Sequence, residues 1–170
     1  MQSVQRFAII GFMGSGKTTL LRTLSKEESL NTYNFYDLDE FIEKRHQITI
    51  KELIETEGMT KFRVHEKQAL EDILKTEKSM ILALGGGTMN HDTIKLFEQK
   101  SVELIWLQTS LDICLKRVRE SGDIRPLNRL CDEDLKGLYE ERLPFYKIAK
   151  YISYGDIDEL LRFITSSTIK

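Results

Sequence analysis

Short apolar runs alternate with longer amphipathic stretches along the chain. The runs with the length and composition of buried strands cover residues 7–10, 34–38, 80–84, 102–107 and 151–153. The stretches with helical spacing cover residues 17–25, 39–45, 50–57, 61–74, 94–100, 110–119, 133–150 and 157–164. Strands that alternate with helices predict a parallel sheet covered on both faces. We therefore expect an α/β fold of three αβα layers with a five-stranded parallel sheet.

Several residues predict where the helices begin and end. Thr49, which has a glutamate three residues later, is typical of a capping box that starts a helix. We expect Gly58 to stop that helix, and Pro144 to interrupt the long helix over 133–150. The polar stretch 120–129 contains a glycine and a proline, so it is expected to form a loop.

The composition fits one globular domain over residues 1–170. The 170 residues have a mass of 19.8 kDa, with 41% hydrophobic and 31% charged, and these proportions exclude a disordered or low-complexity chain. The 25 basic and 27 acidic residues leave a net charge of −2, which argues against a nucleic-acid-binding protein. An anionic ligand must therefore be bound by a few well-placed cations.

The cysteines and histidines form no metal-binding pattern. Cys114 and Cys131 are well separated and the three histidines are scattered, so we expect no zinc site. Two unclustered thiols are typical of a reduced, intracellular protein. The first apolar run is too short for a signal peptide, and no segment approaches the roughly 20 apolar residues that span a bilayer. These features predict a soluble cytoplasmic protein with no membrane partner.

The strongest motif is GFMGSGKT at residues 11–18, which matches G-x-x-x-x-G-K-[ST]. It follows a predicted strand and opens a predicted helix, whereas a chance glycine-rich turn with a solvated lysine needs neither. Its glycines let backbone N–H groups turn toward phosphate oxygens, and the helix N-terminus adds partial positive charge. Lys17 can then reach the β- and γ-phosphates of a nucleotide, and Thr18 can bind Mg²⁺.

Asp37 and Asp39 lie at the carboxyl end of the second predicted strand. If the backbone stays extended there, their side chains point the same way, toward the crevice where parallel sheets bind ligands. One carboxylate can hold Mg²⁺ through water, and the other can accept a proton from an attacking hydroxyl. The alternative is a pair of solvated acids at a helix N-terminus, which suits Asp39 in particular.

Three arginines and a glycine run are further candidates. Arg63 can pair with Glu66, three residues later on a predicted helix, and this pairing would orient the guanidinium. Arg125 and Arg142 also suit bidentate binding of carboxylate or phosphate, although a surface salt bridge explains each arginine more simply when taken alone. The run Gly85–Gly87 after a buried strand allows a ligand or backbone to approach closely.

Taken together and in order, six motifs resemble the shikimate kinase family. They are GFMGSGKTT at 11–19, FYDLDEFIE at 35–43, EGMTKFRVHE at 57–66, LGGGT at 84–88, IRPL at 124–127 and ERLPFY at 141–146. The resemblance covers nearly the whole chain and implies a P-loop NTPase fold of the nucleoside monophosphate kinase type. It also implies ATP-dependent phosphorylation of the 3-hydroxyl of shikimate in aromatic amino-acid biosynthesis, with Mg²⁺ as the cofactor.

The resemblance assigns roles around the transferred phosphate. Lys17 and Thr18 would serve ATP and Mg²⁺, with Asp37 in the outer shell of the metal. Asp39 would contact the reacting hydroxyl and act as its base. The remaining nucleotide contacts would come from the phosphate loop, at Gly14, Ser15, Gly16 and Thr19.

For shikimate, the resemblance implies a substrate-binding region over about 38–74 and a mobile lid over about 117–131. Arg63 and Arg142 would clamp the shikimate carboxylate, with backbone contacts from Gly86 and Gly87. Arg125 would close over the phosphates from the lid. Either Arg117 or Arg119 would lie against the adenine, and the sequence leaves that choice open. The partners are then ATP and shikimate, on a monomer that binds neither nucleic acid nor membrane.

Three residues depart from the family pattern. Met59 stands where glutamate is usual, Leu21 where glycine is usual, and Asn128 where leucine is usual. None of the three is assigned to the chemistry. Two alternatives stay open at this point: another small-molecule kinase, such as a gluconate or nucleoside monophosphate kinase, and a nucleotide-binding protein without catalytic activity.

Overall fold

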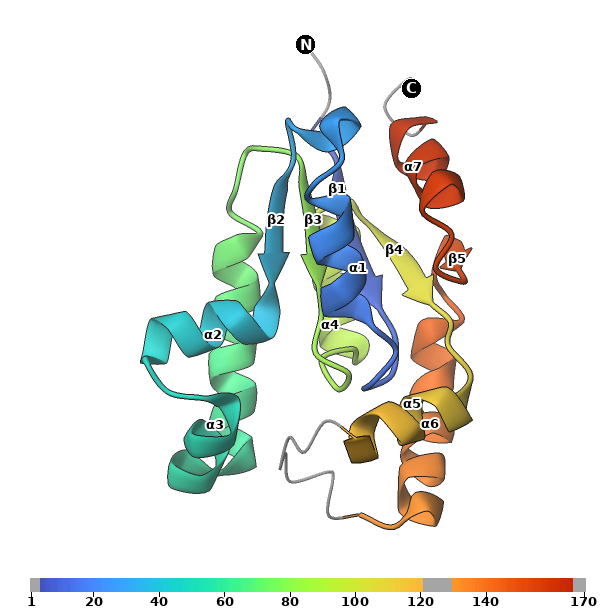
Figure 1. Ribbon diagram of the computed structural model, residues 1–170. Helices are drawn as coiled ribbons and strands as arrows, with labels where there is room; N and C mark the ends of the chain where they lie inside the picture. Colours follow the sequence, from blue (N-terminus) through green and yellow to red (C-terminus); the bar gives the residue numbers. More distant parts are fainter. Residues whose placement is uncertain (1–3, 121–129, 167–170) are drawn as a thin grey trace.

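A five-stranded parallel sheet forms the centre of the protein, as the sequence predicts. The computed structural model describes residues 4–120 and 130–166 (Figure 1). The strands are β1 (Arg6–Ile10), β2 (Asn34–Asp37), β3 (Met80–Ala83), β4 (Val102–Leu107) and β5 (Tyr151–Ser153). They lie in the order β2-β3-β1-β4-β5, with every described pair parallel.

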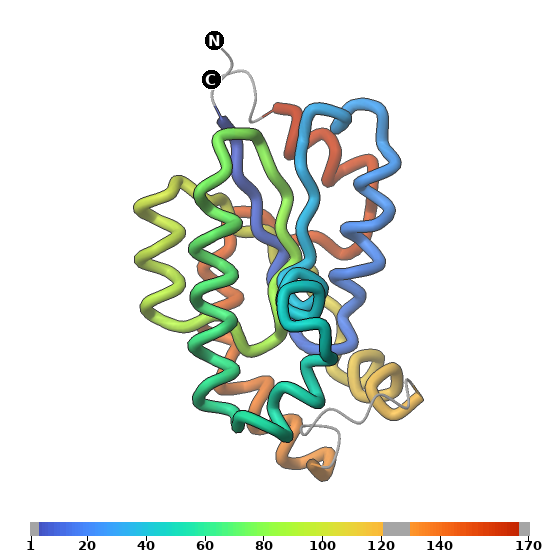
Figure 2. The backbone as a smooth tube through the Cα atoms, turned by 90° about the vertical axis from the view of Figure 1, so that its left-hand side faces the viewer, coloured from blue at the N-terminus to red at the C-terminus, as the bar shows by residue number. Residues whose placement is uncertain are grey.

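Helices cover both faces of the sheet and complete the three layers. They are α1 (Lys17–Leu24), α2 (Leu38–His46), α3 (Ile50–Ile73), α4 (His91–Gln99), α5 (Leu111–Glu120), α6 (Asp132–Tyr146) and α7 (Ile157–Ser166). Helices α1 and α7 lie on one side of the sheet, and α3, α4 and α6 lie on the other (Figures 1 and 2). A 3₁₀ turn over Glu28–Leu30, which the apolar pattern did not predict, lies on the same side of the sheet as α1 and α7.

The strands feed two separate cores because successive side chains point to opposite faces. In β1, Phe7 and Ile9 pack with α1 and α7, whereas Ala8 and Ile10 pack with the helices on the other side. All four residues are at most 1% exposed. Burial on both faces is the reason why this strand is a continuous apolar run.

Helix α3 contains the break expected at Gly58. The capping box is present at its start, where Glu52 N donates to Thr49 Oγ1 (3.2 Å) and Thr49 N donates to Glu52 Oε2 (2.8 Å). Gly58 then takes φ 83° and ψ 162°, a conformation that side-chain-bearing residues rarely adopt, and the helix resumes after it. The break divides α3 into a part before Gly58 and a longer part after it.

The expectation for Pro144 is wrong in detail. The helix does not break there: Pro144 lies inside α6, which runs on to Tyr146 and ends before residue 150. A proline this close to the C-terminus removes only one backbone hydrogen bond, and Lys147 N still donates to Leu143 O at 3.0 Å. The loop expected at 120–129 lies almost wholly outside the described residues.

The strands end level with one another, and this places the predicted site residues together. Ala83 of β3 is in register with Ile9 of β1 on one side and with Asp37 of β2 on the other. The segments that follow these three strands therefore meet at one edge of the sheet, the edge where parallel sheets bind ligands. Across residues 4–120 and 130–166, none of the helices is long and apolar enough to cross a membrane.

Candidate active site

The phosphate loop is closed around its own lysine. Lys17 is 9% exposed, and its Nζ donates to Gly11 O (2.9 Å), Phe12 O (2.8 Å) and Ser15 Oγ (3.4 Å). Gly14 has φ 73°, and a Cβ placed there would lie 2.5 Å from the carbonyl oxygen of Cys114 in α5. Glycine is thus required for this turn, and the turn aims the lysine ammonium at the space that the loop encloses.

The structure separates the roles of Arg117 and Arg119. Arg117 Nη1 donates to two carbonyl oxygens of the phosphate loop, Gly14 O (3.2 Å) and Ser15 O (3.3 Å). Arg119 turns away, since its Nη2 donates to Leu130 O and to Asp132 Oδ1, both at 2.8 Å. Arg117 therefore lies against the phosphate loop, whereas Arg119 ties α5 to the start of α6.

A hydroxyl and a carboxylate meet beside the loop. Thr18 Oγ1 donates to Asp37 Oδ2 at 2.7 Å. The other carboxylate oxygen, Oδ1, accepts from the backbone N–H groups of Asp39 (3.0 Å) and Glu40 (3.3 Å), so Asp37 is the N-cap of α2. The backbone is therefore not extended from 37 to 39: α2 begins at Leu38, and Asp39 lies in its first turn. The two side chains nevertheless line the same pocket.

Two adjoining pockets meet at Asp39. The first has a volume of about 310 Å³ and is lined by the phosphate loop and its neighbours, including Gly14, Gly16, Lys17, Thr18, Thr19, Asp37, Asp39, Gly86 and Arg117. The second has a volume of about 70 Å³, and its polar wall consists of Asp39, Arg63, Glu66, Gly86, Gly87 and Arg142. Both pockets share Asp39, together with Met13, Gly85 and Gly86, so this carboxylate lies on the boundary between them.

Two guanidinium groups converge on the glycine run. A Cβ placed on Gly87 would lie 2.7 Å from Nη2 of Arg63 and 2.9 Å from Nη2 of Arg142. A Cβ on Gly86 would likewise lie 3.3 Å from Nη1 of Arg142. The absence of side chains in this run is what lets both cations reach one place, although α3 and α6 bring them from distant parts of the chain.

Arg142 is held in a costly environment. Burial, together with the nearby charge of Arg63, lowers its pKa from the ordinary value. Its Nη1 is buried and has no hydrogen-bond partner within the described part of the chain. The guanidinium lies over the ring of Phe12, with 5.6 Å from Cζ to the ring centroid. A buried cation with a free donor favours binding of an anion in this pocket.

Tyr146 supports the glycine run from α6. It is 1% exposed, and its hydroxyl donates to Gly86 O at 3.0 Å. Burial raises the pKa of Tyr146 to about 12, although the nearby charge of Arg142 acts in the opposite direction. The hydroxyl therefore keeps its proton, and the hydrogen bond that it donates holds the backbone under the two guanidinium groups.

Comparisons with known proteins identify the family of this chain. A sequence model described as "Shikimate kinase" matches residues 13–166. The chain belongs to the shikimate kinase family. It is 36% identical, over 141 residues, to a shikimate kinase of Sulfurihydrogenibium sp. (strain YO3AOP1), covering 83% of this chain and 82% of that one. The family resemblance and the P-loop kinase fold inferred from the ordered motifs are thereby confirmed.

Solved shikimate kinases have the same fold. The enzyme of Aquifex aeolicus superposes with a TM-score of 0.78 at 31% identity, over 96% of this chain and 95% of the other. The enzyme of Acinetobacter baumannii, in complex with shikimate, gives 0.84 at 27% identity, over 99% and 97%. Membership makes this chain an enzyme of the shikimate kinase family rather than a gluconate or nucleoside monophosphate kinase.

Sequence reasoning gave no role to Thr88, which contacts Glu66 in this shikimate kinase site. Arg63 Nη1 donates to Glu66 Oε2 at 2.6 Å, as the helical spacing predicts. The other oxygen, Oε1, accepts from the hydroxyl of Thr88 at 2.6 Å, and Glu66 is only 5% exposed. The position of Thr88 directly after the glycine run was the available signal, but no local spacing connects it with Glu66.

The departures from the shikimate kinase pattern fall at different places. Met59 lines the smaller pocket and is 38% exposed. Leu21 is buried in the core beneath α1, where its side chain adds to the packing on that face of the sheet. Asn128 and Arg125 lie outside the described residues. Met59 is thus the only one of the described departures that faces the site.

Proposed function

We propose that this chain transfers the γ-phosphate of ATP to the 3-hydroxyl of shikimate, with ATP in the larger pocket and shikimate in the smaller one. The observation that carries the proposal is the shared wall at Asp39, which faces both pockets, while Arg63 and Arg142 converge behind it. Shikimate is a carboxylated polyol, so it needs a cationic clamp at one end and a hydrogen-bond acceptor at the reacting hydroxyl. The smaller pocket offers both.

In the proposed reaction, Asp39 accepts the proton of the attacking shikimate hydroxyl while the hydroxyl oxygen bonds to the γ-phosphorus. The bond from that phosphorus to ADP breaks, and the products are shikimate 3-phosphate and ADP. The protein contributes mainly position and charge, because phosphoryl transfer needs little covalent assistance. Lys17 neutralises charge on the phosphates, and the backbone of residues 14–19 holds their oxygens.

Thr18 and Asp37 are suited to hold Mg²⁺ in this proposal. A hydroxyl and a carboxylate only 2.7 Å apart are hard oxygen donors of the kind that Mg²⁺ prefers. The described residues contain no cluster of three histidine, cysteine, aspartate or glutamate side chains that could bind a metal by themselves. Phosphate oxygens and waters would complete the shell, and the bound ion would neutralise phosphate charge.

The remaining assignments extend the proposal to the whole chain. Residues 1–170 form one kinase domain, with a substrate-binding region over about 38–74 and a lid over about 117–131 that carries Arg125. Arg117 is the proposed adenine neighbour, because it lies on the phosphate loop, whereas Arg119 is engaged with α6. The protein is proposed to act as a monomer in the cytoplasm, without nucleic-acid partners.

A substrate panel tests the proposed function directly. ADP release is measured with Mg-ATP and shikimate, with gluconate or nucleoside monophosphates in parallel reactions. Among these acceptors, we expect only shikimate to give ADP release above the blank. Equal rates with shikimate and without acceptor would contradict the proposal, and a higher rate with another acceptor would replace shikimate by that compound.

A further inference from the structure

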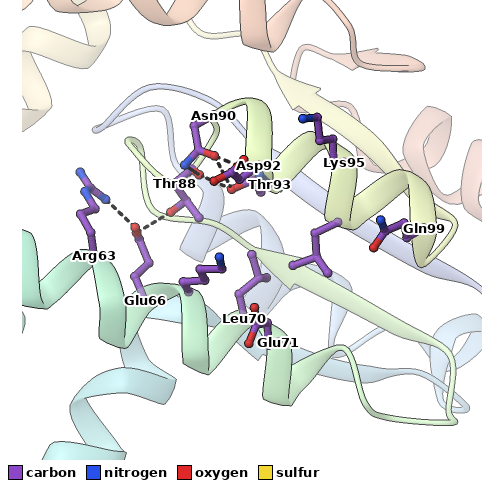
Figure 3. A pocket seen from close by; sticks show the side chains of 12 residues that line it. Arg63, Glu66, Leu70, Glu71, Thr88, Asn90, Asp92, Thr93, Lys95 and Gln99 are labelled. Carbon is purple, nitrogen blue, oxygen red and sulfur yellow. Dashed lines mark hydrogen bonds and ion pairs between the residues drawn. The ribbon is translucent and has the colours of Figure 1, made fainter.

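Glu66 lies on the boundary between two pockets. One is the proposed shikimate pocket, and the other is a larger hollow of about 490 Å³ between α3 and α4. Figure 3 shows Arg63 and Thr88 on either side of Glu66 at the edge of this hollow. Lys67, the next residue of α3, also lines the hollow. The Glu66 side chain could therefore turn away from Arg63, toward the water and the Lys67 ammonium in this hollow.

The Thr88 hydroxyl removes this freedom. Glu66 Oε2 accepts from Arg63 and Oε1 accepts from Thr88, each at 2.6 Å, so both carboxylate oxygens are held and the carboxylate plane is set. With Arg63 as its only partner, the group could rotate about its last bond. Thr88 is 3% exposed, so its hydroxyl has little water to compete for the hydrogen bond.

Thr88 is itself anchored to the start of α4. Thr93 Oγ1 donates to Thr88 O at 2.8 Å, and Thr93 N donates to the helix-capping Asn90 Oδ1 at 3.0 Å (Figure 3). The chain of contacts runs from the α4 N-terminus through Thr88 and Glu66 to the Arg63 guanidinium. It holds the guanidinium by Nη1, whereas Nη2 is the nitrogen that faces Gly87.

We propose that Thr88 is a positioning residue for substrate binding: its hydroxyl fixes Glu66, and Glu66 fixes the Arg63 guanidinium for the shikimate carboxylate. This inference rests on the proposed function, since it assigns Arg63 to the carboxylate. Thr88 lines neither the pocket proposed for ATP nor the pocket proposed for shikimate. Its loss is therefore expected to weaken shikimate binding and to leave the phosphate-transfer step nearly intact.

The test compares Thr88→Val, which keeps the shape and removes the hydroxyl, with Thr88→Ser, which keeps the hydroxyl. Calorimetry gives the Kd of shikimate, and steady-state assays give kcat and both KM values. We expect Thr88→Val to raise the shikimate Kd and KM roughly tenfold, with kcat and the KM of ATP within about threefold of wild type. Thr88→Ser is expected to restore shikimate binding to within about threefold.

Two further variants separate positioning from general loosening. Thr56→Val makes the same change on α3, where the hydroxyl donates to two helix carbonyls, Glu52 O (2.7 Å) and Leu53 O (3.2 Å). This variant is expected to bind shikimate like wild type. In a Glu66→Ala background, Thr88→Val is expected to cause little additional loss, because its partner is already gone.

The outcomes that overturn the inference are distinct from failure of the proposed function. Equal Kd values for Thr88→Val and wild type, equal losses in Thr88→Val and Thr88→Ser, or the same loss with and without Glu66 would each refute the role of the hydroxyl. Wild-type protein that binds no shikimate would instead refute the proposed function. Unfolding midpoints of all variants check that each one is folded.

Discussion

Thr18 donates a 2.7 Å hydrogen bond to Asp37, and the same carboxylate caps α2 through its second oxygen. The pair joins α1, the helix that follows the phosphate loop, to the last residue of β2. One side chain thus serves both a structural bond and the proposed metal site. The two roles use different oxygens, so substitutions can separate them.

Asp37→Asn and Asp37→Ala are expected to differ from each other in stability, but to change the Mg²⁺ requirement of the reaction in the same way. Asparagine retains an oxygen that can cap α2, whereas alanine loses the cap at a cost of about 1 kcal/mol, or roughly 2–4 °C in unfolding midpoint. Both remove the carboxylate charge, so both should require several times more Mg²⁺ for half-maximal rate. Thermal melts and Mg²⁺ titrations check this, and an unchanged Mg²⁺ requirement in both variants would contradict the metal role.

Lys17→Ala is expected to abolish most phosphoryl transfer and leave shikimate binding intact. The ammonium is held inside the phosphate loop and does not line the smaller pocket. Loss of such a charge-stabilising group typically lowers kcat by roughly 100-fold or more. Lys26→Ala, at an exposed position just after α1, is the control. A shikimate Kd that rises in parallel with the loss of kcat would contradict this division.

Arg63→Ala and Arg142→Ala are each expected to weaken shikimate binding roughly 100-fold, because each removes one of the two cations proposed to bind the carboxylate. Arg45→Ala, which removes an arginine paired with Asp72 on the surface, is the matched control and should bind normally. Calorimetry with shikimate checks all three variants. Unchanged affinity in either clamp variant would exclude that arginine from carboxylate binding.

Gly87→Ala is expected to impair shikimate binding more than folding. The new methyl group would lie under 3.0 Å from the ends of the Arg63 and Arg142 side chains, which can move aside but then leave their places in the clamp. We expect at least a roughly tenfold rise in the shikimate Kd. Gly137→Ala meets no atom within 4 Å in α6 and should stabilise the fold by about 0.5–1 kcal/mol without altering binding. Normal binding by Gly87→Ala would show that the clamp is not this closely packed.

Tyr146 is expected to make the fold sensitive to alkaline pH. Its pKa is raised to about 12, whereas an unfolded tyrosine has a pKa of about 10. Above pH 10 the unfolded chain loses this proton first, so stability from this group is complete below pH 10 and falls as the pH rises toward 12. Tyr146→Phe should lose about 1 kcal/mol at neutral pH and show a flatter decline between pH 9.5 and about 11.5.

Urea unfolding at several pH values measures this effect. Tyr154→Phe, which alters a tyrosine that is 74% exposed, is the control and should follow wild type. A Tyr146→Phe profile parallel to that of wild type across the alkaline range would contradict the prediction.

Local relationships were predictable from the sequence. The capping box at Thr49, the break at Gly58 and the Arg63–Glu66 pair all join residues at most a few positions apart, and the structure confirms each. Helical spacing alone brings such groups together. The extended backbone assumed for 37–39 is wrong because the Asp37 side chain caps a helix that begins one residue later. Backbone conformation at a strand end depends on such competing hydrogen bonds.

Relationships between distant residues were not predictable in this way. Arg117 and Arg119 differ by two positions on one helix, yet one lies on the phosphate loop and the other at the start of α6. Thr88 and Glu66 lie 22 positions apart and meet only because β3 and α3 pack side by side. The order of the strands likewise depends on how the helices cover the sheet, since every buried strand has a similar apolar composition.

The sequence by itself determined the alternation of strands and helices, the phosphate loop and the family, because each rests on periodicity or on a contiguous motif. Only the tertiary structure decided which cations share a pocket, which carboxylate lines two pockets, and which hydroxyl bonds to Glu66. Arg63 and Arg142 meet over Gly87 although they are 79 positions apart, and a distance of this kind depends on packing. Local geometry can be read along the chain, whereas charges converge only when the chain folds.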